Sequence, residues 1–95
     1  MKTLNFEMWV SNSQISKETT FKYSIIEANY TTTKVLLEVP VESLDITTKD
    51  LRVICKFKAF GENKTYVLVN FNAGKSLGKE DKKLLMDTFV SSLLG

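Results

Sequence analysis

The stretch from Asp50 to Asn72, DLRVICKFKAFGENKTYVLVNFN, constrains the fold most, because apolar and polar residues alternate on both sides of one turn signal. Successive side chains of a strand point to opposite faces, so this alternation indicates strands rather than a helix. Every odd position from Leu51 to Ala59 is apolar. Gly61 to Lys64 has the composition of a turn, since Gly and Asn tolerate positive φ. The stretch is therefore predicted to be a β-hairpin whose odd-numbered face lies in the core.

The even-numbered side chains of this hairpin form the most informative predicted surface. They combine cations with large apolar groups: Arg52, Ile54, Lys56, Lys58, Phe60, Tyr66 and Leu68. A purely solvated sheet face is expected to carry fewer large apolar residues. We therefore expect another molecule or another part of the chain to cover some of this face.

Three further strands are predicted before the hairpin, at Thr3 to Val10, Thr19 to Ala28 and Lys34 to Val39. A helix is the competing prediction for KYSIIEA in the second of these, but β-branched and aromatic residues favour a strand. Pro40 ends the third strand, because proline cannot donate to the ladder. Val41 to Lys49 is predicted to be a loop with one helical turn around residues 42–44.

A C-terminal helix is predicted to run to about Leu94, with Ser76 or Gly78 as its cap. Its apolar residues recur at spacings of three and four and make one stripe: Leu85, Met86, Phe89, Val90 and Leu93. The predicted fold is therefore a single α+β domain over residues 1–95. It has an antiparallel sheet of about five strands, in the order β-β-β-β-β-α, with the helix packed on one face.

Composition excludes several classes of protein. Ninety-five residues suit one domain, and 43% apolar with 25% charged residues is ordinary for a globular protein. The net charge of +2, with twelve lysines and one arginine, argues against a strongly basic nucleic-acid binder. The lone Cys55 fits a reducing compartment, and the first residues lack the apolar run of a signal peptide. We expect a cytoplasmic protein, or part of a particle assembled in the cytoplasm, with no membrane association.

Catalytic and metal-binding signals are weak. The sequence has no histidine and one cysteine, so serine–histidine and cysteine–histidine catalysis and the usual zinc sites are excluded. Glu7 and Glu38 are predicted to share a sheet face, but two such acids are more often solvated or paired with Lys22 or Lys56. We expect no enzyme activity, no cofactor and no metal.

A weak anion-binding candidate lies between the hairpin and the helix. Gly74, Lys75 and Ser76 stand where a phosphate-binding loop belongs, but the preceding glycine that such a loop requires is replaced by Val69. A simple connection is the favoured interpretation. Lys75, Ser76 and Lys79 remain candidates because a helix N-terminus offers free backbone N–H groups.

Two functional hypotheses share the even-numbered face. Apolar side chains rimmed by charge suit an interface with a protein partner or a second copy, and this is the favoured hypothesis. The alternative is a single-stranded nucleic-acid-binding module that uses lysines and aromatic platforms. Trp9 is a candidate for either role, and it becomes a core residue instead if the first strand is shifted by one position.

The predicted function is thus a non-catalytic binding or assembly protein that acts through an open sheet face or edge, with self-association into a homo-oligomer expected. Small size, simple architecture and lysine-rich composition are typical of small accessory proteins of phages and mobile elements.

Overall fold

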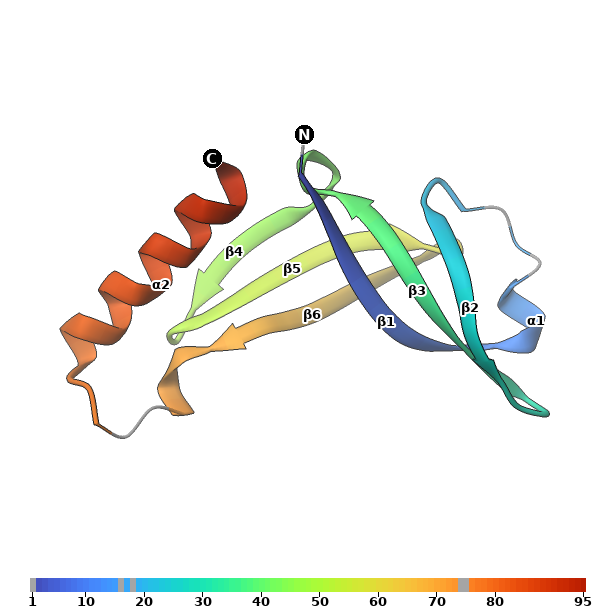
Figure 1. Cartoon of the computed structure of the whole chain (residues 1–95), viewed down its shortest axis with the longest axis horizontal. Coiled ribbons are helices and arrows are strands. Elements are labelled where there is room, and N and C mark those ends of the chain that lie inside the picture. Colours follow the sequence, from blue (N-terminus) through green and yellow to red (C-terminus); the bar gives the residue numbers. More distant parts are fainter. Residues whose placement is uncertain (1, 16, 18, 74–75) are drawn as a thin grey trace.

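The computed structural model describes residues 2–15, 17, 19–73 and 76–95. Within these residues the fold is α+β, with six strands in two antiparallel three-stranded sheets and one long C-terminal helix. The predicted fold class is confirmed, but the single sheet of about five strands is replaced by two sheets. They cross each other, with β1 passing in front of β6 in Figure 1.

The first sheet has the order β1-β3-β2 and is built from β1 (Thr3–Ser11), β2 (Lys22–Ala28) and β3 (Thr32–Pro40). The helical alternative for KYSIIEA is therefore wrong. A short helix α1 (Asn12–Ile15) follows β1. The side chain of Asn12 holds the β2–β3 turn by donating to the carbonyls of Asn29 (3.0 Å) and Tyr30 (3.1 Å) and accepting from Thr33 (2.6 Å).

The second sheet has the order β4-β5-β6 and is built from β4 (Asp45–Lys49), β5 (Arg52–Ala59) and β6 (Glu62–Asn70). The 3₁₀ turn η1 (Val41–Ser43) links the two sheets and agrees with the helical turn predicted there. Strand β4 was predicted to be loop. DITTK contains one apolar residue, so the alternation that marks a half-buried strand is missing from this short edge strand.

Both hairpin turns of the second sheet have two central residues. Phe60 (φ 52°) and Gly61 (φ 77°) connect β5 to β6, and Asp50 (φ 50°) and Leu51 (φ 58°) connect β4 to β5. Two central residues with positive φ are the signature of a type I′ turn, whose twist matches that of the flanking strands. The predicted turn at Gly61 to Lys64 therefore lies one or two residues too late.

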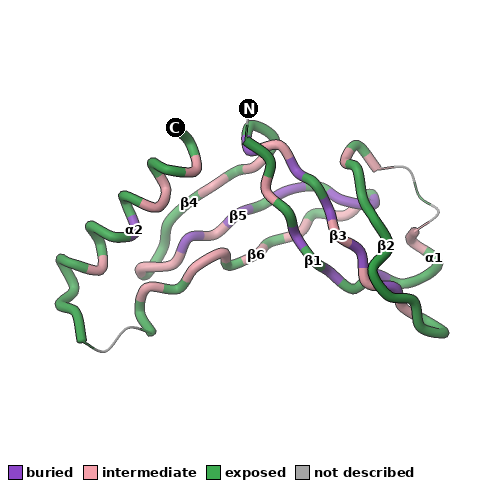
Figure 2. Tube along the Cα trace, viewed as in Figure 1, coloured by how far each residue is buried: buried purple, intermediate pink, exposed green. Residues whose placement is uncertain are grey.

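The main core lies where the two sheets face each other. Its buried residues come from β1, β3, β5 and the β5–β6 turn: Phe6, Met8, Val10, Val35, Leu37, Val39, Cys55, Phe57, Ala59 and Phe60. Figure 2 shows the buried segments concentrated along β1, β3 and β5, whereas β2 is exposed throughout. Phe6 and Phe57 stack across the two sheets with ring centroids 5.0 Å apart. The odd-numbered face of β5 is thus confirmed as core, but the other sheet provides most of its cover.

Helix α2 (Lys79–Leu94) contacts β5 and the 3₁₀ turn η2 (Phe71–Ala73) beside the end of the second sheet (Figure 1). Gly78 is the N-cap of the helix, which confirms one of the two predicted caps. Of the predicted apolar stripe only Met86 is buried, and Leu85 remains 47% exposed. Phe89 is anchored by an edge-on contact with Phe71 at 6.2 Å. The helix therefore covers one end of the sheet rather than a whole face.

Candidate binding face

The outward side of the β4–β5–β6 sheet carries most of the predicted site and is called here the basic face. Because β5 alternates, its buried odd positions leave the even positions outside, and the register places neighbours from β4 and β6 beside them. The face consists of Lys49, Arg52, Lys56 and Lys58 around Ile54 and Val67, with Asp45, Thr47, Asn63, Thr65 and Asn70.

Positive charge dominates the basic face. Four cations share it with the single carboxylate of Asp45, which lies opposite Lys56. Arg52 also meets Asp50 of the adjoining turn at 3.5 Å, an exposed pair of small energetic value. Lys56 and Lys58 are exposed to solvent. The electrostatic potential over the basic face is therefore positive.

The centre of the basic face is apolar. Ile54 on β5 lies directly opposite Val67 on β6, and Val67 is 50% exposed. Neither residue belongs to the main core cluster or to the groups packed against it. Val67 was not among the predicted site residues, because its odd number placed it on the core face. Lys49 was missed because β4 was not predicted to be a strand.

Three predicted members of the face are absent from it, and this part of the prediction is wrong. Phe60 is 1% exposed and packs edge-on against Tyr23 at 5.3 Å. Tyr66 and Leu68 are packed against the core. For Tyr66 and Leu68 the cause is a β-bulge: Val53 pairs with Val69 but Ile54 pairs with Val67, so the extra residue Leu68 reverses the parity of β6. Phe60 lies in the turn between β5 and β6, with a positive φ of 52°.

Loss of these aromatic rings changes the chemistry available to the face. Tyr66 stacks on Phe57 at 5.8 Å inside the protein, and burial raises the pKa of its hydroxyl. A platform for stacking single-stranded bases requires exposed rings beside the cations. The basic face has cations and aliphatic side chains, so base stacking is not among the interactions it offers.

Trp9 lies on the outward side of the other sheet, directly opposite Lys34, and is 48% exposed. The core alternative for Trp9 is therefore wrong. Its neighbour Lys34 forms an ion pair with Glu7 at 3.2 Å. The structure thus places the predicted site residues on two different faces. Trp9 lies on the outward side of the β1–β3–β2 sheet, whereas the predicted cations lie on the basic face of the other sheet.

The anion-binding candidates are only partly placed. Lys75 lies outside the described residues, whereas Ser76 and Lys79 flank the N-cap Gly78. Glu80 and Asp81 occupy the first turn of the helix. The helix dipole stabilises these two negative charges, and the same charges repel an anion at this end of the helix.

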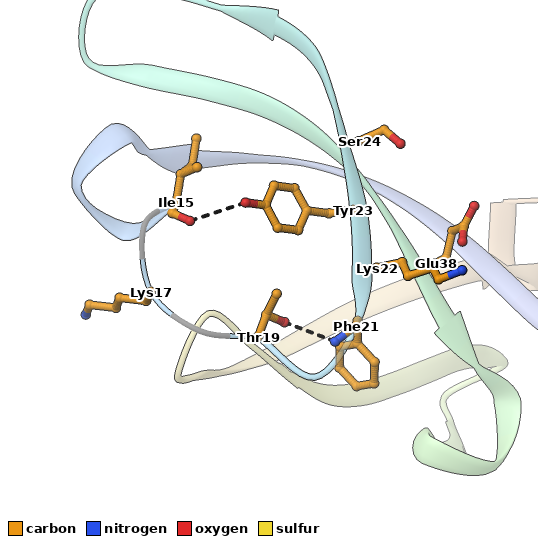
Figure 3. A pocket seen from close by; sticks show the side chains of 8 residues that line it. All are labelled: Ile15, Lys17, Thr19, Phe21, Lys22, Tyr23, Ser24 and Glu38. Atoms are coloured by element: carbon orange, nitrogen blue, oxygen red, sulfur yellow. Dashed lines mark hydrogen bonds between the residues drawn. The ribbon is translucent and has the colours of Figure 1, made fainter.

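A hollow of about 680 Å³ lies beside β2 and has a mixed lining of Ile15, Lys17, Thr19, Phe21, Lys22, Tyr23, Ser24 and Glu38 (Figure 3). The hydroxyl of Tyr23 donates to the carbonyl of Ile15 at 3.4 Å across it. Glu38 lies at its rim next to Lys22, its cross-strand neighbour. Glu7 is not among the described residues that line this hollow, so the predicted pair of Glu7 and Glu38 does not converge on it.

Within the described ranges, no group of three or more histidine, cysteine or acidic side chains is placed to hold a metal ion. The same ranges contain no helix long and apolar enough to span a membrane. Burial raises the pKa of the Cys55 thiol, so this cysteine is held in its neutral form in the core.

Comparison with known proteins adds no family to this description. The chain matches no protein-family model, no curated protein sequence and no solved structure. The inference of function therefore depends on the two outward faces.

Proposed function

We propose that this chain is a non-catalytic binding or assembly protein that acts through the basic face of its β4–β5–β6 sheet. The observation that carries the proposal is the pair Ile54 and Val67 at the centre of four cations, with the side chain of Ile54 partly exposed and that of Val67 half-exposed. Apolar groups surrounded by charge are the usual anatomy of a protein interface, where the centre loses water and the rim stays solvated.

The face supports this role better than the exposed edge of the first sheet. Edge strand β2 carries a bulge between Ile25 and Glu27, which interrupts its register with β3. Bulges at edges discourage the addition of a strand from another chain, because the free backbone groups no longer form a continuous ladder. On the basic face, strand β5 places Arg52, Ile54, Lys56 and Lys58 side by side in an alternating pattern.

A protein partner is favoured over nucleic acid by the same residues. Cations alone give salt-dependent, sequence-independent attraction to phosphates. The aliphatic centre adds nothing to phosphate binding, whereas it contributes directly to a contact with another protein surface. The partner that fits is a protein with carboxylates arranged around exposed apolar groups.

A photo-crosslinking amino acid at position 67 tests the proposal in cells that express the protein. We expect protein adducts at Val67 that disappear when Lys56 and Lys58 are both replaced by glutamate. The matched control carries the crosslinker at Thr88 on the exposed side of α2. Absence of position-67 adducts above this control contradicts the proposal. Adducts made of nucleic acid, together with salt-sensitive anisotropy of a single-stranded oligonucleotide, support the alternative function.

A further inference from the structure

The outward side of the β1–β3–β2 sheet is the second surface with an exposed apolar centre, and it is called here the Trp face. Trp9 on β1 and Leu36 on β3 lie in adjacent rows of this face. Charged side chains surround them: Glu7, Lys22, Glu27, Lys34 and Glu38. Three carboxylates and two cations give the Trp face the opposite balance to the four cations and one carboxylate of the basic face.

We propose that the partner of the basic face is the Trp face of a second copy of this chain, so that copies associate head to tail. The inference rests on the proposed function, because it names the occupant of the basic face. In the contact, Trp9 and Leu36 of one copy cover Ile54 and Val67 of the next. Glu27 and Glu38, both exposed, come near the cations of that neighbour.

Charge decides between this arrangement and a two-fold dimer. Pairing the basic face with itself brings two sets of four cations together. Like charges held opposite each other across an interface are repulsive, so the self-paired dimer is disfavoured. Pairing basic face with Trp face brings unlike charges together and buries both apolar centres.

The shape of the molecule supports repetition of the contact. The two sheets are layered, and their outward faces point away from each other on opposite sides of the molecule (Figure 1). The shortest extent of the chain is 19 Å, against 46 Å for the longest. A heterologous contact between opposite faces leaves one free face at each end, so it generates a ring or a fibre rather than a closed pair.

Each junction is expected to be weak. A three-stranded face with five residues per strand measures roughly 15 by 17 Å from strand spacing and rise. Such a contact falls well below the ~800 Å² per partner of a standard stable interface. Assembly is therefore expected to grow with protein concentration and to weaken with added salt.

Two blocked variants give a sharp test. Trp9→Lys places a cation on the Trp face and leaves the basic face intact, whereas Val67→Glu does the reverse. We expect the wild-type chain to increase in mass with concentration in sedimentation equilibrium, and each variant alone to remain a monomer. A mixture of the two is expected to give a 1:1 dimer, because one intact junction is available and neither end extends further.

Fluorescence reports on the same mixture. Trp9 is the only tryptophan, so Val67→Glu contains the fluorophore and Trp9→Lys is dark at tryptophan wavelengths. Titrating the dark variant into the fluorescent one is expected to shift emission to the blue as Trp9 loses water. The matched control is the doubly substituted chain, which is expected to give no shift. Circular dichroism confirms folding, and Glu27→Lys with Glu38→Lys replaces Trp9→Lys if that variant unfolds.

The outcomes separate this inference from the proposed function. A wild-type chain that stays monomeric at millimolar concentration, or a Trp9→Lys variant that still dimerises alone, overturns the head-to-tail contact. If Val67 adducts to a different protein persist in that case, the basic face is still a binding face and the proposed function stands. If those adducts are also missing, both fail.

Discussion

Replacement of Phe60 is the most informative test of the core. Its ring is 1% exposed and meets Tyr23 edge-on at 5.3 Å. Removal of a buried phenylalanine ring costs about 3–5 kcal/mol through lost burial and the cavity left behind. Alanine inherits the positive φ of 52° and its strain, so no backbone relief offsets this loss. We expect Phe60→Ala to lower the free energy of unfolding by about 3–5 kcal/mol, a large share of the roughly 5–15 kcal/mol of a typical domain.

Urea denaturation followed by circular dichroism measures this change, and the accompanying fall in Tm is expected to be on the order of 12 °C or more. Val67→Ala is the matched control, because Val67 is 50% exposed and its loss is expected to cost within about 0.5 kcal/mol. A Phe60→Ala variant as stable as this control refutes the burial of the ring. It also restores the hypothesis that Phe60 belongs to an exposed interface, which expected the substitution to spare the fold.

Three further predictions concern individual contacts. Burial raises the pKa of the Cys55 thiol, so Cys55 is expected to react with a thiol reagent far more slowly in the native than in the urea-unfolded chain; equal labelling rates contradict this. For the same reason, stability is expected to fall as pH rises above the ordinary thiol pKa of 9.0. The hydrogen bond from Lys64 at 2.9 Å lowers the pKa of Glu62, so the stability that Glu62 contributes is present above the ordinary pKa of 4.5 and is lost as pH falls through the depressed value. In acid titrations the Glu62→Gln variant is expected to lose less stability than the wild-type chain. An unchanged curve argues against the contact. Asn12→Ala is expected to cost about 1–2 kcal/mol in urea denaturation by removing the side-chain bonds that hold the β2–β3 turn. Asn12→Asp, which turns a carboxylate oxygen toward the two carbonyls that the amide bonded, is expected to cost at least as much; equal stability of all three chains refutes the role of Asn12 in holding the turn.

Alternation in β5 predicts the core face correctly because every inward residue is apolar, from Val53 to Ala59. The same rule fails on β6, where the bulge at Leu68 shifts parity without any glycine or proline to mark it. The prediction that placed Phe60 on the outward face is wrong for another reason. A bulky residue is not expected in the left-handed region of φ, and the burial of the Phe60 ring against Tyr23 explains why it adopts that conformation.

The division into two sheets could not be predicted from local sequence patterns. Strand β4 has Ile46 as its only apolar residue, so its existence depends on the β5 ladder beside it rather than on its own composition. Without β4, the hairpin and the first three strands resemble one sheet with a helix to cover it. The outward placement of Arg52, Lys56 and Lys58 was nevertheless predicted, because it follows from the alternation of β5 alone.

Most of helix α2 is not buried against the rest of the protein, and this determines how easily the helix opens locally. The helix buries Met86 alone and is tied to the body by few groups, among them the Phe71–Phe89 contact and a bond from the Lys82 ammonium to the carbonyl of Asn72 at 3.3 Å. Sixteen residues form a marginal helix in isolation. Its amide protons are therefore expected to exchange with solvent through local opening, long before those of β3 and β5 exchange through global unfolding. The protein then behaves as two cooperative units of unequal stability, a durable pair of sheets and a helix that opens on its own.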